Sequence, residues 1–245
     1  MLCAQNISKS YRGVMILDDV SVRLNERETV CLLGKSGVGK TTLFNILAGI
    51  DRPDGGGVFF KGEDITGLAG HVSYMPQKDL LMPYKTVLQN VSLPLLIKGQ
   101  KKALAYARAL ESFDAFGLTG TEKLYPRQLS GGMCQRAALL RTYLFSHDAV
   151  LLDEPFSSLD ALTKSAMHAW FLSLTARLPL AACIITHDID EAILLADRIY
   201  VLSGAPGRIS AEISVPAPRP RGDGFILSSD FLDRKKQIMN VLKKS

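Results

Sequence analysis

The sequence predicts an α/β fold in which a parallel β-sheet forms the core, a small antiparallel β layer flanks it and a helical segment is inserted. Three short apolar runs carry this prediction, at residues 28–33, 149–152 and 181–185. They have the length of strands, and their continuous apolar character indicates strands covered on both faces. Helical spacing follows the first run at residues 41–48 and the second at residues 161–177. Strand, helix, strand in this order favours a parallel sheet with right-handed crossovers.

The remaining segments depart from that alternation. Residues 2–24 and 57–75 predict short strands joined by turns, which would form the antiparallel layer. Helical patterns follow at residues 88–97 and 103–116, and a third helix is expected to open near Ser130. A helical insertion is therefore expected between the antiparallel layer and the apolar run at residues 149–152.

These patterns predict one main domain over residues 1–215, with a helical subdomain at about residues 84–145. Residues 216–245 are expected to form an appendage to it. Its first part, Val215-Pro216-Ala217-Pro218-Arg219-Pro220-Arg221-Gly222, is rich in proline and arginine and predicts a connector with little regular structure. A last helix is predicted near residues 230–242.

The composition is that of an ordinary globular protein. The chain has 245 residues, of which 47% are hydrophobic and 22% charged, and this length suits one large domain or two small ones. The formal net charge is +5, which suits an anionic ligand or a position beside a membrane. No run of five basic residues occurs, so we expect no nucleic-acid partner.

Several classes of protein are disfavoured. The four cysteines are scattered, without a CxxC pair: Cys3, Cys31, Cys134 and Cys183. A disulfide framework or zinc site is therefore not expected, and a reducing compartment is favoured. The first six residues lack the pattern of a signal peptide. The most apolar windows, such as residues 178–185, are far shorter than the ~20 residues of a membrane span, so any membrane role is expected to be peripheral.

A glycine-rich loop is the strongest functional signal. Gly34-Lys35-Ser36-Gly37-Val38-Gly39-Lys40-Thr41 matches G-x-x-x-x-G-K-[ST] at every position, between a predicted strand and a predicted helix. In such a loop, backbone N–H groups and the amino end of the helix cradle phosphate oxygens. Lys40 would reach the β- and γ-phosphates of a nucleotide, and the Thr41 hydroxyl would ligate Mg²⁺. The alternative is a glycine-rich turn that matches by chance. The residues expected to hold ATP here are Gly34, Lys35, Ser36, Gly37, Val38, Gly39, Lys40, Thr41 and Thr42.

A second apolar run ends in two adjacent acids, Asp153 and Glu154. The carboxyl ends of parallel strands are where open α/β sheets bind ligands. Asp153 would hold Mg²⁺, and Glu154 could polarise an attacking water as a general base. Taken alone, the pair could equally cap a helix.

A third motif points to one family. Leu129-Ser130-Gly131-Gly132-Met133-Cys134-Gln135-Arg136 predicts a serine N-cap and a helix start that can bind an anion. With the two motifs above, in this order, it resembles the signature of the ATP-binding cassette (ABC) ATPases. The resemblance covers about residues 2–215. It implies a P-loop NTPase with a RecA-like parallel core, and ATP contacts from Ser130, Gly131 and Gly132.

Four further positions match the family's pattern, and the resemblance assigns each a role. Tyr11 matches the aromatic residue that stacks on adenine. Gln77 matches the glutamine that links Mg²⁺ and the attacking water to the membrane partner. Asp160, in Ser158-Leu159-Asp160, belongs to the loop after the second acidic motif, and His187 matches the switch histidine at the γ-phosphate. Without that context, Tyr11 could be a half-buried strand residue, Gln77 a polar loop residue and His187 a structural or capping histidine. The resemblance thus implies a catalytic set of Lys40, Gln77, Glu154 and His187, with Mg²⁺ held by Thr41, Gln77 and Asp153.

Two anion sites but one terminal phosphate suggest a dimer. The phosphate loop and Ser130 open different helices, so head-to-tail pairing of two chains would place one ATP between the loop of one chain and Ser130-Gly131-Gly132 of the other. Hydrolysis would then reopen the interface. The sequence departs from the family at Cys134, at Leu140-Arg141-Thr142 and at Ser157-Ser158. None of these removes a catalytic group.

Two segments resemble the nitrate/sulfonate/taurine importer subfamily: residues 75–87, and Pro206-Gly207-Arg208-Ile209 with the later Pro218-Arg219-Pro220-Arg221. The resemblance implies an ATPase at the cytoplasmic side of the cell membrane, coupled to separate permease subunits and, through them, to an extracytoplasmic solute-binding protein. The tripeptide 206–208 could also be a simple turn between two strands. The alternative function is a soluble or export-type ABC ATPase.

A contact surface for the permease is also expected. Leu80, Leu81, Met82 and Tyr84 follow Gln77 and would meet a short permease helix, unless they are buried in the helical region. The basic C-terminal helix could face solvent or bind lipid.

Overall fold

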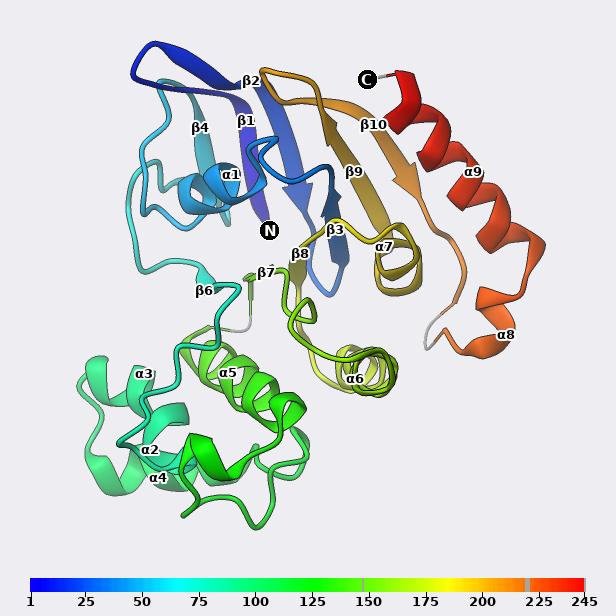
Figure 1. Ribbon diagram of the computed structural model, residues 1–245. Helices are drawn as coiled ribbons and strands as arrows, with labels where there is room; N and C mark the ends of the chain where they lie inside the picture. The colour runs from blue at the N-terminus through cyan, green and yellow to red at the C-terminus, as the bar shows by residue number, and fades with distance from the viewer. Residues whose placement is uncertain (147, 219–220, 245) are drawn as a thin grey trace.

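The computed structural model describes residues 1–146, 148–218 and 221–244. Figure 1 shows two β-sheets with helices packed around them and a separate lobe of helices below. The six-stranded sheet has the order β10-β9-β3-β8-β7-β6, and the four-stranded sheet the order β2-β1-β4-β5. The expected α/β architecture is therefore present, with a largely parallel sheet, an antiparallel layer and a helical block.

The six-stranded sheet contains the predicted apolar runs. Its strands are β3 (Thr29–Leu33), β6 (Ser73–Met75), β7 (Val150–Asp153), β8 (Ala182–Thr186), β9 (Arg198–Ser203) and β10 (Arg208–Ser214). All neighbours pair in parallel except β10, which returns antiparallel to β9. The carboxyl ends of β3, β6, β7 and β8 consequently meet at one edge.

One strand lies in a different sheet from the one expected. Residues 57–75 were predicted to contribute short strands to the antiparallel layer, but β6 pairs in parallel with β7, through Ser73–Val150 and Met75–Leu152. With three residues, β6 carries too little sequence for its period to show which sheet it joins. This pairing brings the segment after Met75 beside the end of β7.

The antiparallel sheet is built from β1 (Leu2–Tyr11), β2 (Val14–Leu24), β4 (Gly55–Phe60) and β5 (Glu63–Asp64). β1 and β2 are ten and eleven residues long, longer than the short strands expected. Residues with positive φ, such as Asn6 and Asp19, accompany the register shifts of this pair. These irregularities weaken the alternation on which the sequence prediction relies.

The helical lobe contains α2 (Val87–Val91), α3 (Leu93–Ile97), α4 (Lys102–Leu110) and α5 (Gly131–Phe145), with a 3₁₀ turn, η1 (Pro126–Gln128). The helix expected at residues 88–97 is thus broken at Ser92. The hydroxyl of Ser92 donates to the carbonyl of Leu88 at 2.7 Å, and Pro94 has no N–H to continue the ladder. The helix expected at residues 103–116 ends at Leu110.

The core helices are α1 (Lys40–Leu47), α6 (Ala161–Arg177) and α7 (Ile189–Leu195). The C-terminal segment forms α8 (Asp223–Ile226) and α9 (Ser229–Lys244), and α9 lies alongside β10 and α7 in Figure 1. Arg219 and Pro220 of the predicted connector lie outside the described residues. In the part of the chain that the structure describes, every helix is too short or too polar to cross a membrane.

The sheet is buried on both faces, as its continuous apolar strands predicted. In β3, Cys31 and Leu33 belong to a cluster with α5, α6 and α7, whereas Val30 and Leu32 belong to a cluster with α1 and the antiparallel sheet. Successive side chains of a strand point to opposite faces, so β3 contributes to both clusters. The loop at its carboxyl end is therefore attached to a strand that is packed on both faces.

Candidate functional site

The phosphate loop connects β3 to α1. Its backbone reaches positive φ at Gly37 and Gly39, 82° and 106°, values that side-chain-bearing residues rarely adopt. At Gly34, a Cβ atom would lie 2.3 Å from the carbonyl oxygen of Leu202 in β9. The loop therefore needs these glycines for its turn and for its close approach to the sheet.

Lys40 is folded back into this loop. Its ammonium donates to the carbonyls of Gly34 at 2.8 Å and Lys35 at 2.9 Å, and the residue is 6% exposed. Burial lowers the pKa of Lys40, against the opposing effect of the carboxylates of Glu154 and Asp153. A poorly solvated cation held by two carbonyls is suited to exchange them for phosphate oxygens, which bear more charge.

Asp153 ends β7 within the same site. It accepts hydrogen bonds from the hydroxyls of Thr41 at 3.1 Å and Tyr74 at 3.3 Å. Burial raises the pKa of Asp153, and these two hydrogen bonds oppose the shift. Carboxylate and hydroxyl oxygens are the ligands that Mg²⁺ prefers, so the pair Thr41 and Asp153 fits this cation.

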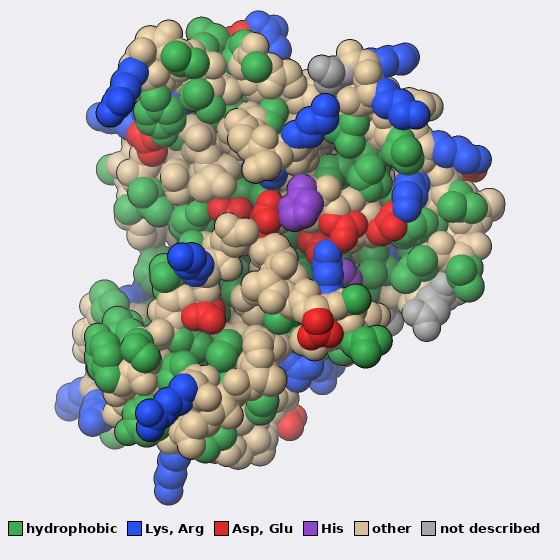
Figure 2. All heavy atoms as spheres, viewed as in Figure 1, with side chains coloured by type: hydrophobic (Ala, Val, Ile, Leu, Met, Phe, Trp, Pro, Cys, Tyr) green, Lys and Arg blue, Asp and Glu red, His purple; other side chains and the backbone are tan. Residues whose placement is uncertain are grey.

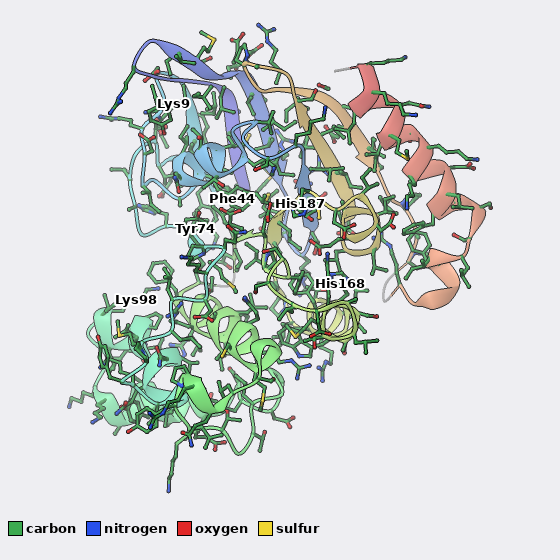
Figure 3. The ribbon with its side chains drawn as sticks, in the orientation of Figure 1. Lys9, Phe44, Tyr74, Lys98, His168 and His187 are labelled. Carbon is green, nitrogen blue, oxygen red and sulfur yellow. The ribbon has the colours of Figure 1, made fainter. Side chains whose placement is uncertain are left out.

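Glu154 stands at a backbone bend, with φ 45°. A non-glycine residue in this region is uncommon and is found often at functional sites. The bend turns the carboxylate towards two loops: Gln77 Nε2 donates to it at 3.3 Å, and His187 Nδ1 lies 3.0 Å from it. Figure 3 shows the labelled His187 near the centre of the molecule, close to the ends of the core strands.

Three side chains thus converge from the ends of three adjacent strands. Gln77 follows β6, Glu154 follows β7 and His187 follows β8. The parallel register brings these loops together, with Asp153 of β7 opposite Ile185 of β8. Figure 2 shows acidic side chains and a histidine gathered in a hollow at the centre of this face.

Most residues of the predicted nucleotide site line one cavity of about 380 Å³. It is lined by Tyr11, Ile16, Ser36, Gly37, Gly39, Lys40, Thr41, Thr42, Gln77, Asp153, Glu154 and Ile185. A second, wider hollow of about 810 Å³ extends from Gln77, Glu154 and His187 to Ser157, Ser158 and Gln135.

Tyr11 lies at the rim of the smaller cavity, at the end of β1. Its ring is partly exposed, and its hydroxyl donates a short hydrogen bond to Asp51. This bond is the main reason that the pKa of Tyr11 is raised to about 12. The ammonium of Lys9 contacts Asp51 at 2.8 Å and lies 5.0 Å from the centre of the ring. The hydrogen bond to Asp51 thus anchors the hydroxyl end of a partly exposed ring.

The signature residues stand elsewhere. Ser130 caps α5 by accepting from the N–H of Met133 at 3.3 Å. Asp160 caps α6 in the same way, with the N–H groups of Leu162 and Thr163 both 3.1 Å away. Among the described residues that line the cavity around Lys40, neither Ser130 nor Asp160 occurs. The single chain therefore leaves part of the predicted site unassembled.

The sequence reasoning missed two polar partners of the site. Tyr74 holds Asp153, and the hydroxyl of Ser157 accepts from Gln77 Nε2 at 3.4 Å. Tyr74 reaches Asp153 because β6 pairs with β7, and no pattern in the sequence signalled that pairing. Ser157 was marked only as a departure from the family pattern, and no motif marked Tyr74.

Known protein families include one whose model matches more than half of this chain. The family model described as "ABC transporter" matches residues 17–157. The chain belongs to the ABC transporter family. Its fold is that of the ABC ATPases, and it is an ATP-binding cassette with ATPase activity, as the three motifs predicted.

The relatives of this cassette include import proteins. It is 43% identical to the formylaminopyrimidine import ATP-binding protein ThiZ of Halalkalibacterium halodurans, over 100% of this chain and 94% of that protein. It is 38% identical to the nitrate import protein NrtD of Synechocystis, over 84% and 77% of the two chains. It is 37% identical to the aliphatic sulfonates import protein SsuB 1 of Shouchella clausii, over 98% and 90%. The resemblance to import ATP-binding subunits of the nitrate/sulfonate type is therefore confirmed.

Solved structures of a similar cassette are dimeric. The chain superposes on the bacterial ABC cassette MJ0796 with a TM-score of 0.75 and 28% identity, covering 89% of this chain and 100% of the other. The same score is found for a dimeric, post-hydrolysis state of that cassette bound to ADP and Pi.

Proposed function

We propose that this ABC cassette is the ATP-hydrolysing subunit of an importer, and that it drives solute uptake through separate permease subunits. The observation that carries the proposal is the meeting of Gln77 and His187 on the carboxylate of Glu154. The names of the relatives support import of a small, polar or anionic solute, and we propose that an extracytoplasmic binding protein supplies it. The cassette itself would lie at the cytoplasmic side of the membrane, as a peripheral subunit without a nucleic-acid partner.

In the proposed mechanism, Glu154 acts as the general base that accepts a proton from the attacking water. His187 and Gln77 hold that carboxylate in place and contact the terminal phosphate and the water. Lys40 and the backbone N–H groups of the loop bind the triphosphate, and Tyr11 stacks on the adenine. Thr41, Gln77 and Asp153 would hold Mg²⁺, which neutralises phosphate charge when bound.

We propose further that ATP is bound between two copies of the chain. The separation of Ser130, Gly131, Gly132 and Asp160 from the cavity around Lys40 supports this step, because a second chain can supply the missing donors. The dimeric state of the similar cassette MJ0796 supports it as well. On this proposal the cassette spans residues 1–215, with a helical subdomain at about 84–145, and residues 216–245 are an appendage.

A groove between the helical lobe and the core is the proposed permease contact. Its volume is about 400 Å³, and its walls are mostly apolar. Of the expected contact residues, Leu80 and Tyr84 are 60% and 71% exposed, whereas Leu81 is buried in the lobe. Arg141 of α5 fixes the loop by donating to the carbonyl of Leu80 at 2.8 Å. Arg141 thus supports Leu80 at the groove, whereas Tyr84 is exposed outside its lining; the apolar walls of the groove are suited to receive a short apolar helix.

Affinity purification of the full-length protein from solubilised membranes of its own cells tests this function. An importer subunit is expected to bring down a multi-span permease and to hydrolyse ATP faster in that complex. Recovery with ribosomes, with DNA or with an export complex instead would overturn the importer proposal and favour the alternative class of ABC ATPase.

A further inference from the structure

The helix α7 is held at both of its ends by the C-terminal segment. It begins at Ile189, two residues after His187, and ends at Leu195. Because His187 lies in the short loop between β8 and α7, a displacement of α7 would displace the backbone next to His187. The imidazole itself is 60% exposed, so packing of the side chain does little to fix it.

Arg221 holds the carboxyl end of α7. Its residue is 4% exposed, and a buried guanidinium must find partners for its donors because it does not lose its charge. Those partners include the carboxylate of Asp197 at 3.8 Å and main-chain carbonyls at the end of α7 and in the connector after β10: Ile193, Leu194, Ala196, Val215 and Ala217. Free carbonyls at the end of a helix carry partial negative charge, so a cation is favoured there. The ring of Phe225 in α8 covers the guanidinium at 5.4 Å.

Lys235 holds the amino end. Its ammonium lies 2.7 Å from the carboxylate of Asp190, in the first turn of α7. This contact joins α9 to the turn that follows His187 directly. Lys164 of α6 contacts the neighbouring Asp188 at 2.8 Å. Side chains from α6 and α9 therefore both form ion pairs with the start of α7.

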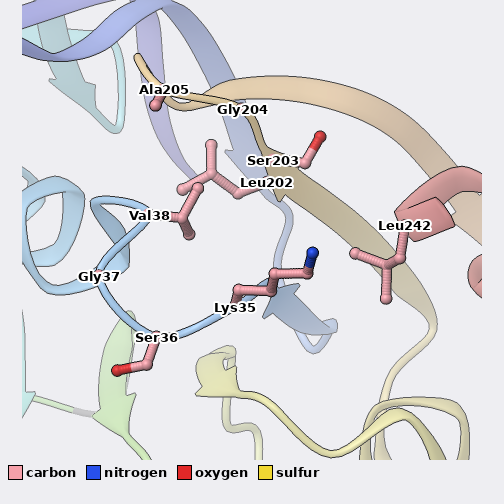
Figure 4. Close-up of a pocket in the computed structure, with 9 residues that line it drawn as sticks. All are labelled: Lys35, Ser36, Gly37, Val38, Leu202, Ser203, Gly204, Ala205 and Leu242. Carbon is pink, nitrogen blue, oxygen red and sulfur yellow. The ribbon is translucent and has the colours of Figure 1, made fainter. Parts of the chain in front are cut away.

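The far end of α9 reaches the phosphate loop. Figure 4 shows Leu242 of α9 and Lys35 of the loop on opposite sides of a cavity, with Val38 nearby. The volume of this cavity is about 350 Å³. One helix therefore passes from the turn after His187 to the outer side of the loop that is expected to bind phosphate.

We infer that Arg221 and Lys235 are positioning residues for ATP hydrolysis, which act through α7 to keep His187 at Glu154. The inference rests on the proposed role of His187, and neither residue touches the nucleotide site itself. Residues 216–244 would thus regulate turnover: a molecule or protein that lifts α9 would slow hydrolysis without removing any catalytic group. Because Tyr11, Lys40 and the phosphate loop bind the nucleotide on the proposed mechanism, loss of the clamp should lower kcat and leave ATP binding unchanged.

Paired variants of the full-length protein test the clamp. Lys235→Ala removes the contact to Asp190, and Lys236→Ala is the matched control because Lys236 is an exposed neighbour that pairs within α9, with Asp233. Lys235→Ala should lower kcat about two- to fivefold, the range that an exposed ion pair supplies, and should leave the ATP dissociation constant unchanged. Arg221→Gln strands several buried carbonyls and should lower kcat more than tenfold.

Two further measurements separate positioning from a loss of folding. The charge swap Asp190→Lys with Lys235→Asp should restore most of the rate lost in Lys235→Ala. Amide hydrogen exchange should accelerate at residues 187–190 in Lys235→Ala, and not in Lys236→Ala, while the strands of the core stay protected. Unchanged exchange there, or a full rate in Lys235→Ala and Arg221→Gln, would overturn the inference. A full rate in His187→Ala would instead contradict the proposed role of His187, and the exchange data would still decide whether the clamp exists.

Discussion

The Nδ1 atom of His187 lies 3.0 Å from a carboxylate oxygen of Glu154. The two residues are 33 positions apart in the sequence, and they meet because they follow neighbouring parallel strands at one edge of the sheet. The contact is already present in the single chain. In the proposed dimer, a second chain would therefore not need to build this pair, only to bring the signature residues opposite it.

Glu154→Gln should abolish ATP hydrolysis and preserve ATP binding. The amide keeps the shape of the carboxylate but cannot accept the proton, and loss of a general base costs about 10²–10⁴ in rate. The variant should elute as a dimer with ATP in gel filtration, since the bound triphosphate is no longer cleaved. Glu63→Gln, an exposed residue of β5, is the control and should behave as the wild type. Elution of the Glu154 variant as a monomer in ATP would contradict the shared site.

Tyr11→Ala should weaken ATP binding, and Tyr11→Phe should keep it close to the wild-type value. Stacking of a base on an aromatic ring contributes about 1–3 kcal/mol, so the alanine variant should bind ATP roughly 5- to 150-fold less tightly. Calorimetric titration with ATP measures the change, and titration with inorganic tripolyphosphate supplies the control because it lacks a base. The pKa of Tyr11, raised to about 12, keeps the hydroxyl neutral, so the effect should not vary between pH 6 and pH 9. Equal loss for both ligands would show that the ring does not meet the adenine.

Asp153→Asn should raise the stability of the nucleotide-free protein at neutral pH while removing Mg²⁺-dependent hydrolysis. Burial raises the pKa of Asp153 above its ordinary value, so between the two pKa values the folded chain binds a proton more tightly than the unfolded chain does. The free energy of unfolding therefore falls as pH rises through that interval, and the loss persists at pH 7. Below pH 3.8, the ordinary pKa of an aspartate, Asp153 is protonated in both the folded and the unfolded chain. Its ionisation then no longer makes the wild type less stable than Asp153→Asn.

Urea unfolding at pH 7 and at the lowest pH at which the fold persists measures this difference. Asp233→Asn, an exposed change on α9, is the control. A less stable Asp153→Asn protein at pH 7 would show that the hydrogen bonds from Thr41 and Tyr74 outweigh the cost of burial.

Tyr84→Glu should uncouple transport from hydrolysis. The side chain is 71% exposed and lies four residues after Leu80, which lines the groove, so the substitution should leave the fold and the basal ATPase rate unchanged but place a charge against an apolar permease helix. Uptake of solute in cells that carry the variant should fall at least tenfold, with basal ATPase of the purified subunit as the control. Leu104→Glu, on α4 and 60% exposed, is the control substitution outside the groove. Normal uptake with Tyr84→Glu would remove this contact from the proposal.

The fold could be predicted where single segments carry strong signals. The buried strands β3, β7 and β8 were predicted from continuous apolar runs. The helix expected at residues 161–177 has the bounds of α6. Less could be predicted where the pairing of strands that are distant in the sequence decides which sheet a strand joins. With three residues, β6 carries no period, and only its pairing with β7 places it in the core sheet. Ser92 and Pro94 break a stretch whose apolar spacing indicated one helix.

The site could be predicted as a set of residues but not as an arrangement. Motif spacing named Lys40, Asp153, Glu154 and His187, because each motif fixes its own residues to one loop. It did not name Tyr74, whose hydroxyl reaches Asp153 from another strand. Nor did it give Arg221 of the proline-rich connector a role, because the burial of this arginine depends on carbonyls more than 20 positions away.

The course of α9 has a practical consequence for anyone who labels this protein. Its last turn, with Leu242, borders the same cavity as Lys35. A bulky purification handle attached at the carboxyl terminus would crowd the phosphate loop and distort measured turnover. A small fluorophore on Lys244 would, for the same reason, serve as an optical reporter of nucleotide arrival. Met1 precedes β1 in the other sheet and is the safer place for a handle.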